Sequence, residues 1–179
     1  MKRQIKSSKG YITTDQATIG SGLRRLYHSQ QFHAFVTTVL GEKSLYPYAD
    51  ALSSINDNYA HDGQELGRHF ENSSFAIPLP LQAPIVGLFE YMSNFRDSAA
   101  EEMNFTGVAD VLDGKTPIKI LEMQSGTFLL FCGRNSLHGV TPTFGDRTRL
   151  LVVLAYNDVP DMRLSEGTPM IFYGRVGTQ

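Results

Sequence analysis

The pattern of apolar and polar positions changes between the first quarter of the chain and the rest. Over residues 13–41, apolar side chains recur at three- and four-residue steps, which is typical of helices with one buried face. A break near Ser29 predicts two helices, and Gly41 is a suitable residue for ending the second one. We therefore expect a helical layer at residues 13–41.

From residue 53 onward the apolar runs are short and are separated by turn-forming residues, which predicts strands. We expect strands at 53–60, around His69, and at 75–82, 89–92, 118–123, 127–132, 150–156 and 170–175. Residues 45–48 are expected to form a loop and residues 97–113 to be weakly helical. Pro78 and Pro80 cannot donate backbone hydrogen bonds, so their strand should lie at a sheet edge or contain a bulge.

Two of the connections are short enough to suggest hairpins. The turn at 61–64 would join strand 53–60 to the His69 strand, and the polar segment after Cys132 would join strand 127–132 to strand 150–156. Many short strands after a pair of helices predict a mainly β protein, with a double-stranded β-helix (jelly-roll) core packed on an N-terminal helical layer. We expect one domain over residues 1–179, with the core at about 53–176.

Composition narrows the classes of function. The chain has 179 residues and a net charge of −2, so nothing indicates binding to nucleic acid. No apolar run has the length of a membrane span, and no apolar segment follows the basic first ten residues, so we expect a soluble cytoplasmic protein. Cys132 is the single cysteine, which excludes an intramolecular disulfide and a cysteine-based zinc site.

Candidate metal ligands stand in two separate places. His69 and Glu71 are two residues apart, so on an extended strand both side chains would point to the same face. Together with His138 they make two histidines and one carboxylate, the ligand set of non-haem iron(II) oxygenases. Arg149 opens the strand at 150–156 and can bind a carboxylate in bidentate fashion. Arg147 competes for that role, but its position in a turn favours solvent exposure.

Further polar residues lie near these positions, and each has two interpretations. Arg134 would either bind substrate or brace its loop. Asn72, Ser74, Gln82 and Tyr91 would either line a pocket or serve the local structure through hydrogen bonds and packing.

The sequence around these residues resembles that of the iron(II)- and 2-oxoglutarate-dependent dioxygenases. Their signature is H-x-D/E, a distal histidine, and an arginine roughly ten residues later; His69, Glu71, His138 and Arg149 follow that order and spacing. The segments HFENSSFAIPLPLQAP, GLFEY, GRNSLHGVTP and the late YGR at 173–175 further resemble a bacterial branch that includes hydroxylases and halogenases of free amino acids. The resemblance covers about residues 20–176.

The resemblance implies a role for each residue. His69, Glu71 and His138 would hold iron(II), and Arg149 would clamp the distal carboxylate of 2-oxoglutarate. The reaction would consume O2, release succinate and carbon dioxide, and oxidise a small molecule such as a free amino acid or its derivative. Halogenating members have a small residue in place of the carboxylate ligand, so Glu71 favours hydroxylation.

Two alternatives stay open from the residues. One is a cupin-type metal-binding protein that does not use 2-oxoglutarate, and the other is a non-catalytic domain that kept the fold. The N-terminal section is shorter than in the relatives it resembles, so one wall of the pocket would either be open or be completed by a second subunit. Homodimerisation is therefore a further hypothesis.

Overall fold

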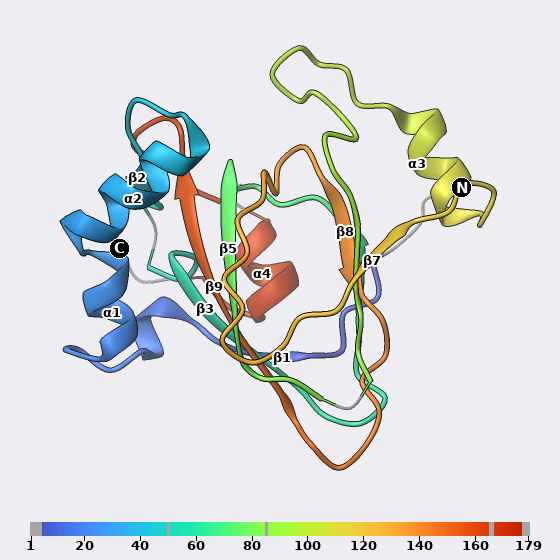
Figure 1. The fold of residues 1–179 in the computed structure, drawn as a ribbon, viewed down its shortest axis with the longest axis horizontal. Coiled ribbons are helices and arrows are strands. Elements are labelled where there is room, and N and C mark those ends of the chain that lie inside the picture. Colours follow the sequence, from blue (N-terminus) through green and yellow to red (C-terminus); the bar gives the residue numbers. More distant parts are fainter. Residues whose placement is uncertain (1–4, 50, 85, 165–166, 177–179) are drawn as a thin grey trace.

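Two antiparallel sheets form the centre of the fold, shown in a computed structural model (Figure 1) that describes residues 5–49, 51–84, 86–164 and 167–176. In the larger sheet the central strand β9 pairs with three others, and the members are β1 (Gly10–Ile12), β3 (Ile55–Ala60), β9 (Arg149–Asn157), β2 (Tyr46–Pro47) and β5 (Phe75–Gln82). The smaller sheet follows the order β4 (Leu66–His69), β8 (Leu137–Val140), β6 (Phe89–Met92) and β7 (Lys119–Leu121). This arrangement confirms the expected double-stranded β-helix.

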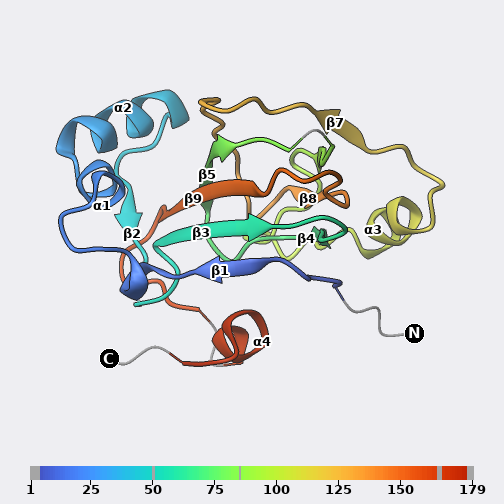
Figure 2. The same cartoon turned by 90° about the horizontal axis from the view of Figure 1, so that it is seen from below.

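The expected pair of N-terminal helices is present. A short 3-10 helix, η1 (Thr14–Gln16), precedes α1 (Gly22–Tyr27) and α2 (Gln30–Leu40). The Ser29 hydroxyl accepts a hydrogen bond from the Phe32 N–H at the start of α2, and Gly41 ends it with a left-handed φ of 71°. Figure 2 shows both helices beside one end of the larger sheet.

Two more helices lie apart from this layer. Helix α3 (Phe105–Leu112) lies at the opposite end of the molecule, next to the smaller sheet, and α4 (Thr168–Tyr173) lies beside β1 (Figure 2). None of the helices in the described residues has the length and apolar character needed to cross a bilayer.

Strand β9 presents different side chains on its two faces because side chains alternate along a strand. Val152, Leu154 and Tyr156 are fully buried against the helical layer, in a cluster that includes Tyr27 and Val36. The rings of Tyr27 and Tyr156 stack at 4.6 Å, and each phenol donates a hydrogen bond to a buried carbonyl of the opposite element. The other face of β9 points toward the smaller sheet and borders a cavity.

The segment at 127–132 is not a regular strand, contrary to expectation. It runs beside β5, where Leu129 donates to the Pro78 carbonyl and Phe131 exchanges backbone hydrogen bonds with Ala76. Ala76 donates to Phe131 on this side of β5, and the next donors with the same direction would be residues 78 and 80, which are prolines. The ladder therefore cannot continue. The same strand has the predicted bulge, since its register with β9 shifts between Pro80 and Gln82.

The two hairpin predictions are wrong. Strands β3 and β4 belong to different sheets, because the short connection between them crosses from one sheet to the other. Segment 127–132 lies beside β5 without forming a regular strand, and the chain passes through β8 of the smaller sheet before it reaches β9. His138 lies within β8 and not in a turn. The tail is helical over Thr168–Tyr173, where a strand was expected; Pro169 favours a helix start and Gly174, with φ of 67°, ends the helix. Residues 46–47 form the short strand β2 within the predicted loop.

Truncation of Leu154 tests the core. Leu154→Ala removes a fully buried side chain between the helical layer and the sheet, so we expect a loss of about 2–5 kcal/mol in the free energy of unfolding. Leu81→Ala, at a half-exposed position on β5, is the matched control and should cost less than about 1 kcal/mol. Urea denaturation followed by circular dichroism measures both. Equal effects would contradict this description of the core.

Candidate metal centre

His69 and His138 lie directly opposite each other on the neighbouring strands β4 and β8. Both side chains are buried, and their ring centroids are 4.3 Å apart. The register between the strands shifts between Leu66 and His69, which marks an irregularity next to the paired histidines. Backbone pairing thus holds the two imidazoles side by side.

A backbone carbonyl holds each imidazole in one orientation. His69 Nδ1 lies 2.9 Å from the Gly67 carbonyl oxygen, and His138 Nδ1 lies 3.0 Å from the Ser136 carbonyl oxygen. A carbonyl oxygen can only accept, so Nδ1 must be the protonated nitrogen of each ring. Burial, with the nearby His69, lowers the pKa of His138 below its ordinary value and favours the neutral ring. The Nε2 lone pair of a neutral ring is then available to a metal.

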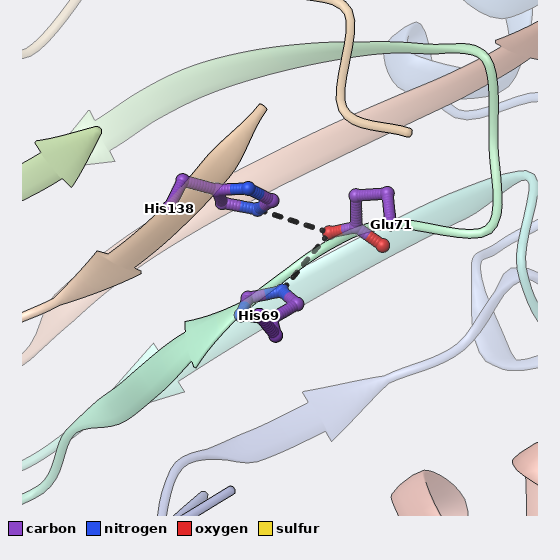
Figure 3. Close-up of side chains that lie close together, drawn as sticks. All are labelled: His69, Glu71 and His138. Carbon is purple, nitrogen blue, oxygen red and sulfur yellow. Dashed lines mark hydrogen bonds and ion pairs between the residues drawn. The ribbon is translucent and has the colours of Figure 1, made fainter. Parts of the chain in front are cut away.

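Glu71 completes the cluster just after the end of β4 (Figure 3). Its Oε1 lies 3.4 Å from His69 Nε2 and 3.5 Å from His138 Nε2. Loss of hydration raises the pKa of Glu71, but the adjacent imidazoles of His138 and His69 outweigh this and hold the pKa well below its usual value. The carboxylate is therefore ionised and faces both histidines.

These donors fit a divalent ion. The ligand atoms of His69, Glu71 and His138 all lie within 4.8 Å of one another. Separations near 3.4 Å are long for hydrogen bonds, but they suit atoms that share one ion at about 2.1 Å each. Two imidazole nitrogens and one carboxylate oxygen are also the donor set that non-haem iron(II) sites use.

Arg149 borders the same cavity from the opposite sheet. It is the first residue of β9, and its side chain is buried, whereas Arg147 is exposed. Burial lowers the pKa of Arg149 to about 10, so the guanidinium stays charged at neutral pH. Its Nη2 is buried without a hydrogen-bond partner among the described residues. An unpaired buried donor of this kind can donate a hydrogen bond to an anionic ligand.

The cavity between the sheets has walls that the sequence did not reveal. Lys9 and Tyr11 come from the N-terminal strand region, Asn58 from β3, and Phe172 and Tyr173 from α4. Burial lowers the pKa of Lys9 to about 7, although the Glu71 charge acts against this shift. No motif marks these residues. Lys9 stands in a basic stretch, and the residues of α4 were expected to form a strand.

Five further polar residues are secondary candidates from the sequence, and one of them borders the cavity. The five are Asn72, Ser74, Gln82, Tyr91 and Arg134. Asn72 lines the cavity, next to the candidate ligand Glu71. Arg134 lies outside the lining residues, where its guanidinium donates to the Asn72 carbonyl oxygen at 3.3 Å and lies 3.7 Å from a carboxylate oxygen of Asp158. The contacts of Arg134 thus connect the loop after β4 with the residue after β9.

The other secondary candidates also lie outside the cavity lining. The Ser74 hydroxyl donates to Asp158 at 2.6 Å. The Gln82 amide donates to the Thr148 carbonyl at 2.7 Å. Tyr91 pairs with His138 across β6 and β8, and its ring stacks near Phe89 at 6.2 Å between centroids. These contacts belong to the local structure around the site.

A comparison with protein families identifies the chain. The Halogenase D family model matches residues 3–168, which is most of the sequence. The chain belongs to the Halogenase D family. Among curated proteins, none matches the sequence significantly.

Solved structures with similar folds agree with this architecture. The non-heme alpha ketoglutarate dependent epimerase SnoN from nogalamycin biosynthesis aligns with a TM-score of 0.60 at 15% identity over 83% of this chain. The carbocyclase SnoK from the same pathway aligns with 0.59 at 16% identity over 82%. A 2OG-Fe(II) oxygenase family oxidoreductase from Burkholderia pseudomallei aligns with 0.55 at 14% identity over 76%. The chain spans 62%, 62% and 56% of these proteins, respectively, and the likeness shows the shared fold.

Gly133 tests the position of Glu71. A Cβ at Gly133 would lie 2.8 Å from Glu71 Cγ and 2.9 Å from its Cβ, so Gly133→Ala must displace that side chain. We expect affinity for iron(II) or cobalt(II) to fall about 10-fold, as measured by anaerobic titration. Gly22→Ala is the control, because a Cβ there meets nothing within 4 Å. Unchanged metal affinity in a folded Gly133→Ala protein would contradict the assignment of Glu71 as a metal ligand.

Proposed function

We propose that this chain is a non-haem iron(II)- and 2-oxoglutarate-dependent oxygenase that hydroxylates a small molecule. His69, Glu71 and His138 would hold the iron, and Arg149 would bind the distal carboxylate of 2-oxoglutarate. When bound, iron(II) and 2-oxoglutarate supply with O2 the oxidising chemistry, which releases succinate and carbon dioxide. The remaining steps depend on how this chain's residues bind and orient the reactants.

The observation that supports the proposal best is the joint position of two groups in one cavity. The three donor atoms lie together on one side. Arg149, whose Nη2 has no hydrogen-bond partner among the described residues, borders the same cavity from the facing sheet. A dicarboxylate with one end at the metal would present its other end to a charged, planar guanidinium. A cupin-type metal protein without 2-oxoglutarate has no need of such a buried cation.

The walls of the cavity favour a dry site. Phe131 packs edge-on against the His138 ring at 4.8 Å between centroids, and the Phe89 ring lies 5.8 Å from the same imidazole. Phe172 and Tyr173 of α4 also line the cavity. Apolar walls exclude water from the metal side and strengthen the electrostatic attraction of Arg149 for a carboxylate.

Glu71 favours hydroxylation over halogenation. A halogenase must leave a coordination position for chloride, whereas this chain keeps a carboxylate that faces both histidines. An ionised Glu71 would fill that position and repel a halide anion. We therefore propose a hydroxylating member of a family named for halogenation.

The substrate we propose is a free amino acid or a derivative of one. Support comes from the resemblance of segments such as GRNSLHGVTP to the bacterial branch that acts on amino acids. The cavity also offers amide and hydroxyl groups from Asn56, Asn72 and Thr168 among its apolar walls. Such a mixture suits a small ligand with polar ends.

Anaerobic titration tests the cofactor assignment. Metal-free protein receives iron(II) and then 2-oxoglutarate, and we expect the visible metal-to-ligand charge-transfer band to appear. His138→Ala should abolish the band because it removes a ligand. Arg149→Ala should raise the 2-oxoglutarate concentration needed by about 10-fold or more, because a charge-assisted hydrogen bond is lost.

The titration also has an outcome that contradicts the proposal. If iron(II) binds to the wild-type protein and no band appears at any 2-oxoglutarate concentration, the chain is a metal-binding or non-catalytic member of the fold. Arg147→Ala is the matched control for Arg149→Ala, since Arg147 is exposed and should leave the titration unchanged.

Chloride tests the role of Glu71. In the wild-type iron(II)–2-oxoglutarate complex, we expect millimolar chloride to leave the charge-transfer band unchanged, because Glu71 fills the halide position. In Glu71→Ala the position opens, and chloride should shift the band and tighten 2-oxoglutarate binding several-fold. A wild-type band that responds to chloride as strongly as the variant would favour halogenation.

A further inference from the structure

A second cationic side chain, that of Lys9, lines the same cavity as Arg149. The pairing of strands in the larger sheet indicates its position. Gly10 pairs with Tyr59 across β1 and β3, and Lys9 directly precedes Gly10, so extending this register by one residue would place Lys9 opposite Ala60. Ala60 in turn pairs with Arg149 across β3 and β9. Residues paired directly across strands point to the same face of a sheet. Lys9, Ala60 and Arg149 therefore form one cross-strand row on the face that borders the cavity.

Both ends of this row reach the cavity. Lys9 and Arg149 stand one strand to either side of Ala60, and both line the cavity, whereas Ala60 itself is buried and does not line it. Neighbouring strands lie about 4.8 Å apart, so the two long side chains start from positions close enough to contact one ligand in the cavity.

Asn58 and Tyr11 hold the Lys9 side chain over the cavity face. The Lys9 ammonium donates to Asn58 Oδ1 and lies 4.2 Å from the centroid of the Tyr11 ring. The Asn58 amide itself donates to the Leu151 carbonyl of β9 at 3.3 Å, which orients its oxygen toward β1. An ammonium has three donor hydrogens, so a hydrogen bond to Asn58 leaves further donors for a ligand.

The charges around the cavity favour the binding of an anion. Within the described residues, neither Lys9 nor Arg149 forms an ion pair with a carboxylate. Glu71 is the one acidic side chain among the described lining residues, and in the proposed function it binds the metal. A divalent ion with two cationic side chains then outweighs one carboxylate, which favours a ligand with two negative charges.

We propose that Lys9 is a second binding residue for the distal carboxylate of 2-oxoglutarate, acting together with Arg149 in the cavity that both residues line. The inference rests on the proposed function, since it assigns a further residue to the same co-substrate. It makes the strand region before β1 a part of the binding site. A carboxylate on the substrate is the competing use of the same cation, and the experiment separates the two.

The test compares two ligands that differ only at the end that Lys9 would bind. 2-Oxoglutarate and 2-oxovalerate share the keto-acid end, but 2-oxovalerate has a methyl group where 2-oxoglutarate has the distal carboxylate. Each is titrated anaerobically into the iron(II) protein without substrate, and the charge-transfer band reports binding. We expect Lys9→Met to weaken 2-oxoglutarate binding about 10-fold and to change 2-oxovalerate binding less than twofold.

Lys9→Gln separates charge from structure. Its amide can still donate toward Asn58, so a purely structural Lys9 would be replaced without loss, whereas a carboxylate-binding Lys9 would not. We expect Lys9→Gln to lose 2-oxoglutarate affinity selectively, as Lys9→Met does, and Lys9→Arg to keep most of it. Lys119→Met, on the exposed strand β7, is the matched control and should match the wild type for both ligands.

Two results would overturn the inference. The first is that Lys9→Met and Lys9→Gln weaken the binding of both ligands equally. The second is that 2-oxoglutarate binding is not weakened in a variant whose melting temperature is unchanged. Either result would show that Lys9 does not bind the distal carboxylate, and would favour the competing role of Lys9 in binding a substrate carboxylate. Both results presuppose a band in the wild-type protein. Absence of that band contradicts the proposed function instead, so the two failures are distinguishable.

Discussion

The structure depends on the alternation of side chains along β9. One face of this strand carries fully buried residues such as Val152 and Leu154, which pack against the two N-terminal helices. The opposite face carries Arg149 and borders the cavity. Since successive side chains point to opposite faces, a shift of one residue in the pairing of β9 would bury the cation in the core and expose the core to the cavity. The stability of the core and the binding of a ligand in the cavity thus both depend on the pairing register of β9.

The candidate metal centre depends on the smaller sheet in a different way. His69 and His138 are neighbours because β4 and β8 pair, and backbone carbonyls two residues earlier accept from each Nδ1. Orientation of the rings therefore needs no additional side chain. Glu71 lies just beyond β4, where the chain has left the ladder and the carboxylate can turn back toward both rings. The sheet supplies rigidity to the histidines, and the loop supplies the third donor.

Membership of the Halogenase D family and the presence of Glu71 together describe a chemical distinction within one fold. In the proposed function the two histidines would serve either chemistry, and Glu71, two positions after the first histidine, would occupy the place that a halide needs at the metal. The N-terminal strand region adds a second distinction, since Lys9 brings a cation to the row that contains Arg149. Lys9 and Tyr11 bring the N-terminal strand region into the cavity lining.

The sequence by itself determined the class of fold and indicated the candidate metal and co-substrate ligands. The spacing of His69, Glu71, His138 and Arg149 pointed to the metal and co-substrate groups, and helical periodicity predicted both N-terminal helices. Only the tertiary structure decided which strands share a sheet, because short connections look alike whether they form a hairpin or cross between sheets. It also decided the place of Lys9, since pairing between strands about 50 residues apart leaves no local pattern.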